Sequence, residues 1–194
     1  MNKSFNEFTH FFGLESQTTC EAENVSNFIK IFSGQEFGQG IFRVVEKDDI
    51  EKWHDVVLEM FSDFQETFLL FGYDWLGRFF ATNEIENAVF LFDSSTNNIL
   101  TLEIDFSSFV NKMLPKHAKD ILDLNVYKKW IKKNNPPQYS NCIGYKIPLF
   151  LGGKDSIHNF EECDMEVYWS ISAQIISQIK NKADGTVIDS FSIE

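Results

Sequence analysis

Apolar side chains recur every three or four residues in several stretches of the chain, which is the spacing of one face of an α-helix. The clearest stretch runs from about Asp48 to Phe61, and Asp48 with Glu51 three residues later resembles a capping box. Shorter stretches with this spacing are residues 4–12 and 23–32 and the segments SSFVNKML, LNVYKKWIKK and SISAQIISQIKNK. We therefore expect helices near both ends of the chain and in its middle.

Other stretches have the composition and alternation of β-strands. IFRVV predicts a short strand, and ETFLLFGYDWLGRFFATN predicts further strands. NAVFLFDSSTNNILTLEIDF predicts a hairpin with a polar turn, and KIPLFLGG predicts an edge strand at Pro148 that leads into a Gly-Gly turn. The order of helices, antiparallel strands and more helices predicts an α+β fold. We expect a single compact domain, with helices packed against a mixed or mostly antiparallel sheet.

The segment ECDMEVYW alternates between apolar and polar residues and predicts one more strand. One face would carry Cys163, Met165, Val167 and Trp169, and the other Glu162, Asp164, Glu166 and Tyr168. Carboxylates side by side repel one another, so they need solvent, a cation or a basic partner. Three interpretations stay open: a charged edge that discourages strand pairing, a partner-binding surface, and a metal or catalytic site.

Charge narrows the class of partner. The 194 residues include 21 Phe, typical of a phenylalanine-rich core, and the formal net charge is −12. Such a chain is repelled by nucleic acid and by anionic lipid, so we expect neither as a partner. It suits a basic partner, although acidic proteins are also simply soluble.

No stretch reaches the roughly 20 apolar residues of a membrane span. The three dispersed cysteines indicate free thiols, and we expect a cytoplasmic protein.

Common catalytic motifs do not occur. The sequence has no GxSxG, HExxH or GxGxxG, and GGKDS lacks the spacing and the hydroxyl of a phosphate-binding loop. The histidines are dispersed without metal-ligand spacing. A nucleophile pair of Cys142 or Cys163 with His158 is conceivable, but the alternation places Cys163 among apolar residues. We therefore expect a protein that is not an enzyme and has no catalytic, cofactor-binding or metal-binding residues.

The stretch CIGYKIPLFLGGKDSIHNFEECDMEVYWSISAQI, read with GYDWLGRFFAT, VFLFD and FSSFVNKML, resembles a bacterial family. That family is the C-terminal domain of type VI secretion DNase immunity proteins. FSGQEFGQGIFRVVEKDDIEKW is broadly similar to the GAD-like region that often precedes it, and the order of elements also looks like the SUKH immunity proteins. The resemblance implies a shortened GAD-like region over residues 1–64, within the same compact unit, and the immunity domain over residues 65–194.

The resemblance implies an antitoxin that binds a cognate toxin, often a nuclease, and blocks its active or substrate-binding site. A basic nuclease would suit the acidic surface of this chain. The first candidates for toxin contacts are Asp155, Glu161, Glu162, Asp164, Glu166 and Tyr168, and the second are Trp75 and Arg78. Two alternatives remain: a sensor module that binds a small ligand or peptide in a deep aromatic cavity, and a hydrolase with a dispersed carboxylate or Cys–His site.

Overall fold

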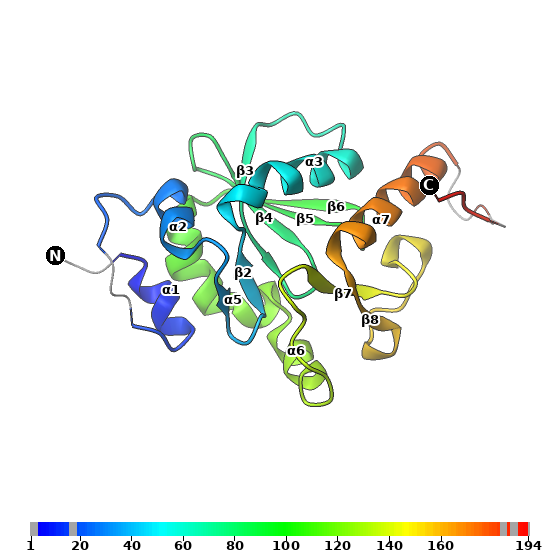
Figure 1. Ribbon diagram of the computed structural model, residues 1–194. Helices are drawn as coiled ribbons and strands as arrows, with labels where there is room; N and C mark the ends of the chain where they lie inside the picture. Colours follow the sequence, from blue (N-terminus) through cyan, green and yellow to red (C-terminus); the bar gives the residue numbers. More distant parts are fainter. Residues whose placement is uncertain (1–3, 16–18, 183–185, 187–189, 194) are drawn as a thin grey trace.

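A six-stranded antiparallel sheet forms the centre of the protein. The computed structural model describes residues 4–15, 19–182, 186 and 190–193 (Figure 1). The strands lie in the sheet in the order in which they occur along the chain. They are β1 (Glu36–Phe37), β2 (Phe42–Val44), β3 (Phe68–Asp74), β4 (Phe79–Asn83), β5 (Val89–Asp93) and β6 (Asn98–Leu102). The sheet and its helices confirm the predicted α+β fold.

Helices cover both faces of the sheet and give three layers (Figure 1). One face is covered by α1 (Asn6–Phe11), α2 (Val25–Phe32), α4 (Phe106–Ser108), a π-helical turn (Phe109–Met113), α5 (Leu114–Ile121) and α6 (Leu124–Trp130). The other face is covered by α3 (Ile50–Met60) and α7 (Met165–Ile179), which pack against each other. The π turn ends two residues before Pro115, which has no N–H to donate to the carbonyl four residues earlier.

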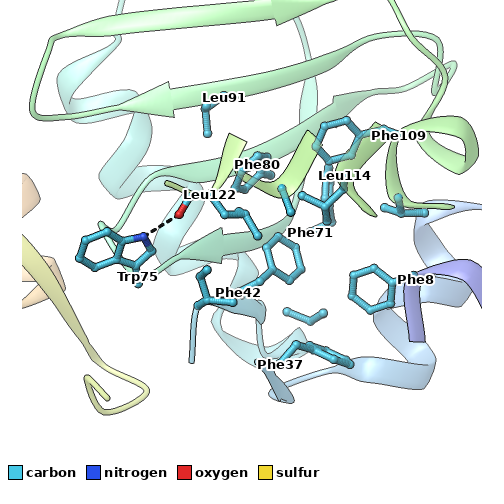
Figure 2. Close-up of a cluster of buried hydrophobic side chains, with 14 of the residues drawn as sticks. Phe8, Phe37, Phe42, Phe71, Trp75, Phe80, Leu91, Phe109, Leu114 and Leu122 are labelled. Atoms are coloured by element: carbon cyan, nitrogen blue, oxygen red, sulfur yellow. Dashed lines mark hydrogen bonds between the residues drawn. The ribbon is translucent and has the colours of Figure 1, made fainter. Parts of the chain in front are cut away.

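Phenylalanine dominates the core under α1 and α2, as the composition predicts. Phe28 is 0% exposed, and its ring lies 5.1 Å from Phe5 and 5.0 Å from Phe8, both edge to face. Figure 2 shows how this cluster continues under the sheet to Phe71 and Phe109. Edge-to-face pairs add to the stabilisation from burial, so mutual ring packing fixes the N-terminal helices on the sheet.

A β-bulge in β3 decides which side chains reach each core. The register with β4 shifts between Leu70 and Gly72, so Phe71 has no direct partner. As a result Phe71 lies in the core under α1 and α2, whereas Leu70 and Tyr73 lie under α3 and α7. A Cβ at Gly72 would lie 2.5 Å from the Phe42 ring, so glycine makes room for that ring.

A second, two-stranded sheet lies beside the end of the main sheet. It consists of β7 (Asn141–Tyr145) and β8 (Phe160–Asp164), and a loop with two 3-10 turns (Leu149–Leu151 and Ile157–Asn159) joins them. The strand predicted around Pro148 is wrong, because Pro148 follows β7 and begins the first of these turns. Gly152 then reverses the chain with φ of +83°.

One further detail differs from the predictions. Asp48 does not cap α3, because residues 47–49 form a 3-10 turn and α3 begins at Ile50 without a side-chain cap. Strand β2 pairs with β3, so the sheet crosses the expected boundary between residues 64 and 65. Residues on both sides of this boundary therefore contribute to one sheet and to the cores on both of its faces.

Candidate functional site

The predicted acidic strand is in part a helix. Strand β8 ends at Asp164, and its carboxylate accepts a hydrogen bond from the Val167 backbone N–H at 3.0 Å as the N-cap of α7. Val167 is consequently 54% exposed, and the two-sided strand expected over residues 162–169 is wrong. The helical signal is present in the sequence, since Met165, Trp169 and Ala173 recur every four residues, but the alternation of the preceding residues obscures it.

Four acidic residues of this segment were predicted to contact a toxin, and three of them have partners within the chain. Asp164 caps α7, Glu162 accepts a hydrogen bond from the Asn141 side chain at 3.0 Å, and Glu166 forms an ion pair with Lys52 at 2.5 Å. Glu161 is exposed and lies opposite Gly144 on β7. Since neighbours on a strand point to opposite faces, Glu161 and Glu162 do not form one stripe.

Tyr168 lies between the small sheet and α7. Its ring occupies the space beside Gly144, where an added Cβ would lie 2.7 Å away, and its hydroxyl accepts a hydrogen bond from the Tyr145 N–H at 3.3 Å. Burial raises the pKa of Tyr168 above its ordinary value. Tyr168 therefore helps to hold α7 on the small sheet and does not line an acidic strand face as predicted.

The turn between β3 and β4 holds the other two predicted contacts, and both lie inside the protein. Trp75 is 0% exposed, and its indole N–H donates to the Leu122 carbonyl at 2.9 Å (Figure 2). The structure thus corrects the expectation of an interface tryptophan. Arg78 donates to the buried Asp74 carboxylate at 2.7 Å and to the Ile121 carbonyl at 2.8 Å. These two side chains join the turn to the end of α5.

Asp74 organises the turn as well as pairing with Arg78. One of its carboxylate oxygens accepts hydrogen bonds from the backbone N–H groups of Leu76 at 3.0 Å and Arg78 at 3.1 Å. Burial raises the pKa of the Asp74 carboxyl, and the Arg78 charge and its hydrogen bonds oppose that shift. The Asp74–Arg78 ion pair is therefore a buried and fully hydrogen-bonded element of the fold.

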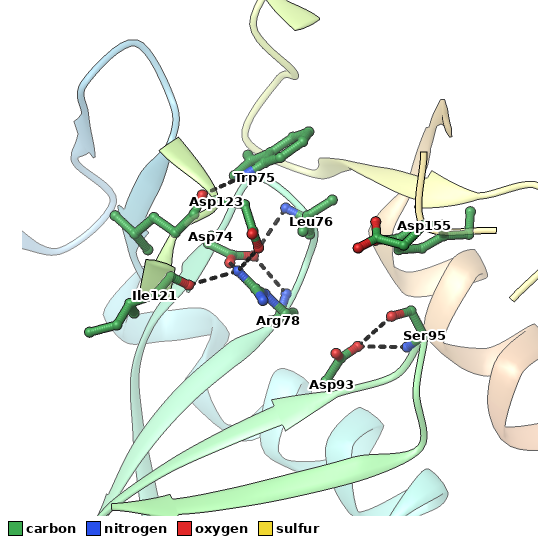
Figure 3. A network of polar contacts seen from close by, with 11 residues as sticks. Asp74, Trp75, Leu76, Arg78, Asp93, Ser95, Ile121, Asp123 and Asp155 are labelled. Carbon is green, nitrogen blue, oxygen red and sulfur yellow. Dashed lines mark hydrogen bonds and ion pairs between the residues drawn. The ribbon is translucent and has the colours of Figure 1, made fainter. Parts of the chain in front are cut away.

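Three more aspartates gather around this ion pair, as Figure 3 shows. Asp123, at the start of α6, lies 3.1 Å from the Arg78 guanidinium. Asp93 ends β5 and accepts hydrogen bonds from Ser95, and Asp155 accepts one from the Tyr145 hydroxyl at 2.8 Å. We call Asp74, Asp93, Asp123, Asp155 and the central Arg78 the acidic cluster. One guanidinium and four carboxylates give it a formal charge of 1 − 4 = −3.

The members of the acidic cluster influence one another electrostatically. Burial raises the pKa of Asp123, and the negative charges of Asp155 and Asp93 raise it further against the opposing charge of Arg78. The loop that carries Asp155 is tied to the β5–β6 turn, because the Phe150 N–H donates to the Ser95 carbonyl at 3.1 Å. This end of the sheet therefore presents an excess of negative charge suited to a cationic group from outside.

Only Arg78 and Asp155 of this cluster were among the predicted residues. Asp93 and Asp123 are single acids at the ends of elements, and nothing local in the sequence distinguishes them. Their convergence depends on the packing of the β3–β4 and β5–β6 turns against the start of α6 and the β7–β8 loop. Among the described residues, no group of three or more potential ligands is placed to hold a metal ion.

A groove of about 600 Å³ lies elsewhere, between the end of α3, the β5–β6 turn and the end of α7. Phe61, Phe64 and Phe150 line it, and the Asp63–Lys180 ion pair at 2.5 Å lies at its edge. This groove is where the alternative sensor module would bind a ligand. The Cys–His alternative has less support, because Cys142 is buried and His158 is exposed in the β7–β8 loop.

Comparison with known proteins finds a similarity between the C-terminal part of the chain and one family. Residues 104–176 match the family described as T6SS immunity protein Tdi1, C-terminal. The matched segment runs from α4 to α7 and contains Asp123, Asp155 and the small sheet. The match confirms the resemblance to a type VI secretion immunity family that the sequence predicted.

The fold as a whole is also found in a solved structure. The crystal structure of Atu4351 from Agrobacterium tumefaciens is similar with a TM-score of 0.58, and the similarity covers 88% of each chain. At 14% identity this similarity concerns the fold alone. A search of curated proteins finds no match. Within the described part of the chain, no helix has the length and apolar character needed to cross a membrane.

Proposed function

We propose that this protein is a cytoplasmic immunity protein that binds a cognate type VI secretion toxin and blocks its active or substrate-binding site, without being an enzyme itself. The observation that carries the proposal is the match of residues 104–176 to the Tdi1 C-terminal family, which implies a type VI secretion immunity protein. The same match contains the small sheet and two members of the acidic cluster, so the matched segment includes surface as well as core.

We further propose that the toxin is a nuclease and that its basic surface docks on the acidic cluster. A nuclease presents cationic groups to phosphates, and a protein of net charge −12 attracts such groups over long distances. Asp93 and Asp155 are the contacts to test first, because Asp74 and Asp123 are already paired with Arg78. Glu161, opposite Gly144, is a further exposed acid of the small sheet. Glu162, Asp164 and Glu166 would contribute mainly to the local structure and field.

The experiment is co-purification with the toxin encoded beside this gene, followed by a binding titration at low and high salt. The test variant is Asp93→Asn with Asp155→Asn, which keeps the hydrogen-bond acceptors and removes two charges. The matched control is Glu84→Gln with Glu103→Gln, two exposed acids at the opposite end of the sheet. We expect the test variant to bind about tenfold more weakly or worse, since charge pairs at such interfaces are worth on the order of 1 kcal/mol or more each.

The outcomes separate the parts of the proposal. The control variant should bind within about twofold of the unchanged protein, because two distant charges alter only the screened long-range field. A tight complex in which both variants bind equally well would move the interface away from the acidic cluster. A toxin that remains active on its substrate in the complex would overturn active-site blocking. Failure to form any complex would contradict the immunity function, and a co-purified ligand would then favour the sensor module and its groove.

The N-terminal region has a supporting role in this proposal. We propose that residues 1–64 are a shortened GAD-like region that folds together with the immunity domain. Strands β1 and β2 come from this region and extend the main sheet through β3, which supports a shared folding unit. Expression of residues 65–194 alone should accordingly give a poorly folded protein, detectable by the loss of cooperative thermal unfolding.

A further inference from the structure

Two cysteine sulfurs face each other across the small sheet. Cys142 on β7 and Cys163 on β8 are directly paired, both are free thiols, and their Sγ atoms lie 3.8 Å apart. The strand register brings the two cysteines together in every folded molecule, so their contact is a fixed feature of the fold. Their separation along the chain, 21 residues, hides the relation in the sequence.

The backbone around the two cysteines has the geometry for a disulfide. The Met165 N–H donates to the Ser140 carbonyl and the Lys146 N–H to the Asn159 carbonyl, so the hydrogen-bonded pairs alternate from these two ends. That alternation makes Cys142–Cys163 a hydrogen-bonded pair, for which the Cα atoms lie about 5.5 Å apart. This separation falls inside the range of about 4.4–6.8 Å found for disulfides. Bond formation therefore requires side-chain rotation and little movement of the strands.

Glycines make the space that the two sulfurs occupy. A Cβ at Gly77 would lie 3.0 Å from the Cys142 sulfur, and a Cβ at Gly144 would lie 2.8 Å from the Cys163 sulfur. Either contact is too close for a real side chain. The Trp169 indole N–H donates to the Gly77 carbonyl at 2.9 Å, which holds this glycine in place. The sulfurs are thus held side by side by packing from both directions.

The two thiols differ in exposure and in acidity. Cys142 is 0% exposed, whereas Cys163 is partly exposed on the outer strand. A hydrogen bond from the Cys142 thiol lowers the pKa of Cys163, and the Gly144 backbone N–H lowers it as well. The same hydrogen bond, together with burial, raises the pKa of Cys142. A partly exposed thiol of lowered pKa in contact with a buried thiol is the arrangement in which the first is oxidised and the second resolves it.

We propose that Cys142 and Cys163 form a redox pair in which a peroxide oxidises Cys163 and Cys142 closes a disulfide across β7 and β8. In the first step the Cys163 thiolate attacks the peroxide O–O bond, which gives a sulfenic acid and, with hydrogen peroxide, hydroxide. In the second step the Cys142 sulfur attacks the Cys163 sulfur, the S–O bond breaks, and the thiol proton leaves with the hydroxyl group as water. A dithiol reductant restores both thiols and is itself oxidised to a disulfide.

The disulfide would fasten the two strands beneath α7, in the hairpin whose connecting loop carries Asp155. Closing a loop of this size removes conformations from the unfolded chain and typically stabilises a protein. Oxidation should therefore raise the thermal midpoint of the protein, and reduction should reverse the rise. This inference concerns the chain alone and holds or fails independently of the toxin.

The test treats the purified full-length protein with hydrogen peroxide and maps its thiols by mass spectrometry of peptides prepared without reductant. The expected result is an intramolecular Cys142–Cys163 disulfide, a Cys20 that still reacts with an alkylating agent, and full reversal by dithiothreitol. Cys142→Ala should leave a sulfenic acid on Cys163 that reacts with dimedone. Cys163→Ala should leave Cys142 reduced, because the buried thiol has no accessible thiolate partner. Circular dichroism establishes that each variant is folded.

Three results would overturn the proposal. The first is that all three thiols remain free under peroxide concentrations that oxidise a model thiol. The second is that disulfides involve Cys20 or join separate chains in place of the Cys142–Cys163 bond. The third is overoxidation of Cys163 to a sulfinic acid in the unchanged protein with no disulfide formed. Because the first measurement uses the unchanged protein, it remains decisive even if a cysteine variant fails to fold.

Discussion

Replacing Arg78 by methionine should destabilise the protein by about 3–5 kcal/mol, the usual cost of removing one partner of a buried ion pair. Asp74 is 0% exposed, and in the variant its carboxylate would lose both the charge of Arg78 and the side-chain hydrogen bond at 2.7 Å. The backbone hydrogen bonds from residues 76 and 78 would remain, so the turn itself would persist. Methionine keeps most of the aliphatic volume, which limits the effect of packing.

The cost should depend on pH in a defined direction. The pKa of Asp74 in the folded protein is already raised by burial, and without Arg78 it rises further above its value of about 3.9 in the unfolded chain, because nothing on Arg78 then opposes burial. A carboxyl with a raised pKa favours the folded state when protonated. The deficit is therefore largest above the folded pKa and shrinks as the pH falls through it. Urea unfolding of the unchanged protein and the variant at pH 8 and at pH 5 measures the loss of stability at each pH.

The design includes a control that separates charge from packing. The double variant Asp74→Asn with Arg78→Met removes the buried charge, keeps an acceptor for the backbone N–H groups, and should recover at least about 1 kcal/mol relative to Arg78→Met alone. With a urea slope of about 3 kcal/mol/M, the single variant should lower the midpoint by roughly 1–2 M. A loss below about 1 kcal/mol, or a loss that is the same at both pH values, would refute the account of Asp74 as a buried charge that depends on Arg78.

Two further predictions concern the β7–β8 loop and the tyrosines. Gly153→Ala should lower the thermal midpoint more than Gly152→Ala, because an added Cβ would lie 1.9 Å from the Ile147 carbonyl oxygen at residue 153 and in open space at residue 152. At residue 152 only the φ of +83° opposes alanine, at a cost of about 1–2 kcal/mol. Equal thermal midpoints for the two variants would show that the loop rearranges freely. Burial raises the pKa of all five tyrosines, to about 12 for Tyr127 and Tyr139, so the folded protein should show little tyrosinate absorbance at pH 11. The stability that these protonated phenols contribute to the folded state is fully present below pH 10 and is lost as the pH rises through 12. Tyrosinate absorbance of the folded protein that titrates like that of the urea-unfolded chain would contradict this prediction.

Local sequence patterns predict most of the helices and hairpins of this protein. The apolar spacing of Val25, Phe28, Ile29 and Phe32 predicts α2, and the structure buries all four. The polar turn SSTNN predicts the β5–β6 hairpin, whose register places Asp93 opposite Asn98. In both cases the pattern that identifies the element lies within one continuous segment, so the element can be predicted from sequence alone.

The start of α7 shows where local patterns fail. ECDMEVYW fits a two-residue period, but Asp164 satisfies the Val167 N–H and the apolar face of the following helix packs on α3. Tertiary packing therefore selects the four-residue period. The acidic cluster could not be predicted for another reason: its members come from four turns and helix ends that lie far apart in the sequence. The same holds for the Cys142–Cys163 pair, which only the register of β7 and β8 brings together.

The sequential order of the main sheet has a consequence for how the protein is made. Each strand after β1 pairs with the one before it, so every later strand that leaves the ribosome finds its neighbour already present. Such short-range pairing avoids large losses of chain entropy and favours rapid folding during synthesis. The strands of the whole sheet are available once residue 102 has emerged, and α4, α5, α6, the small sheet and α7 must dock afterwards. We expect a nascent chain to have paired the strands of the main sheet well before synthesis ends.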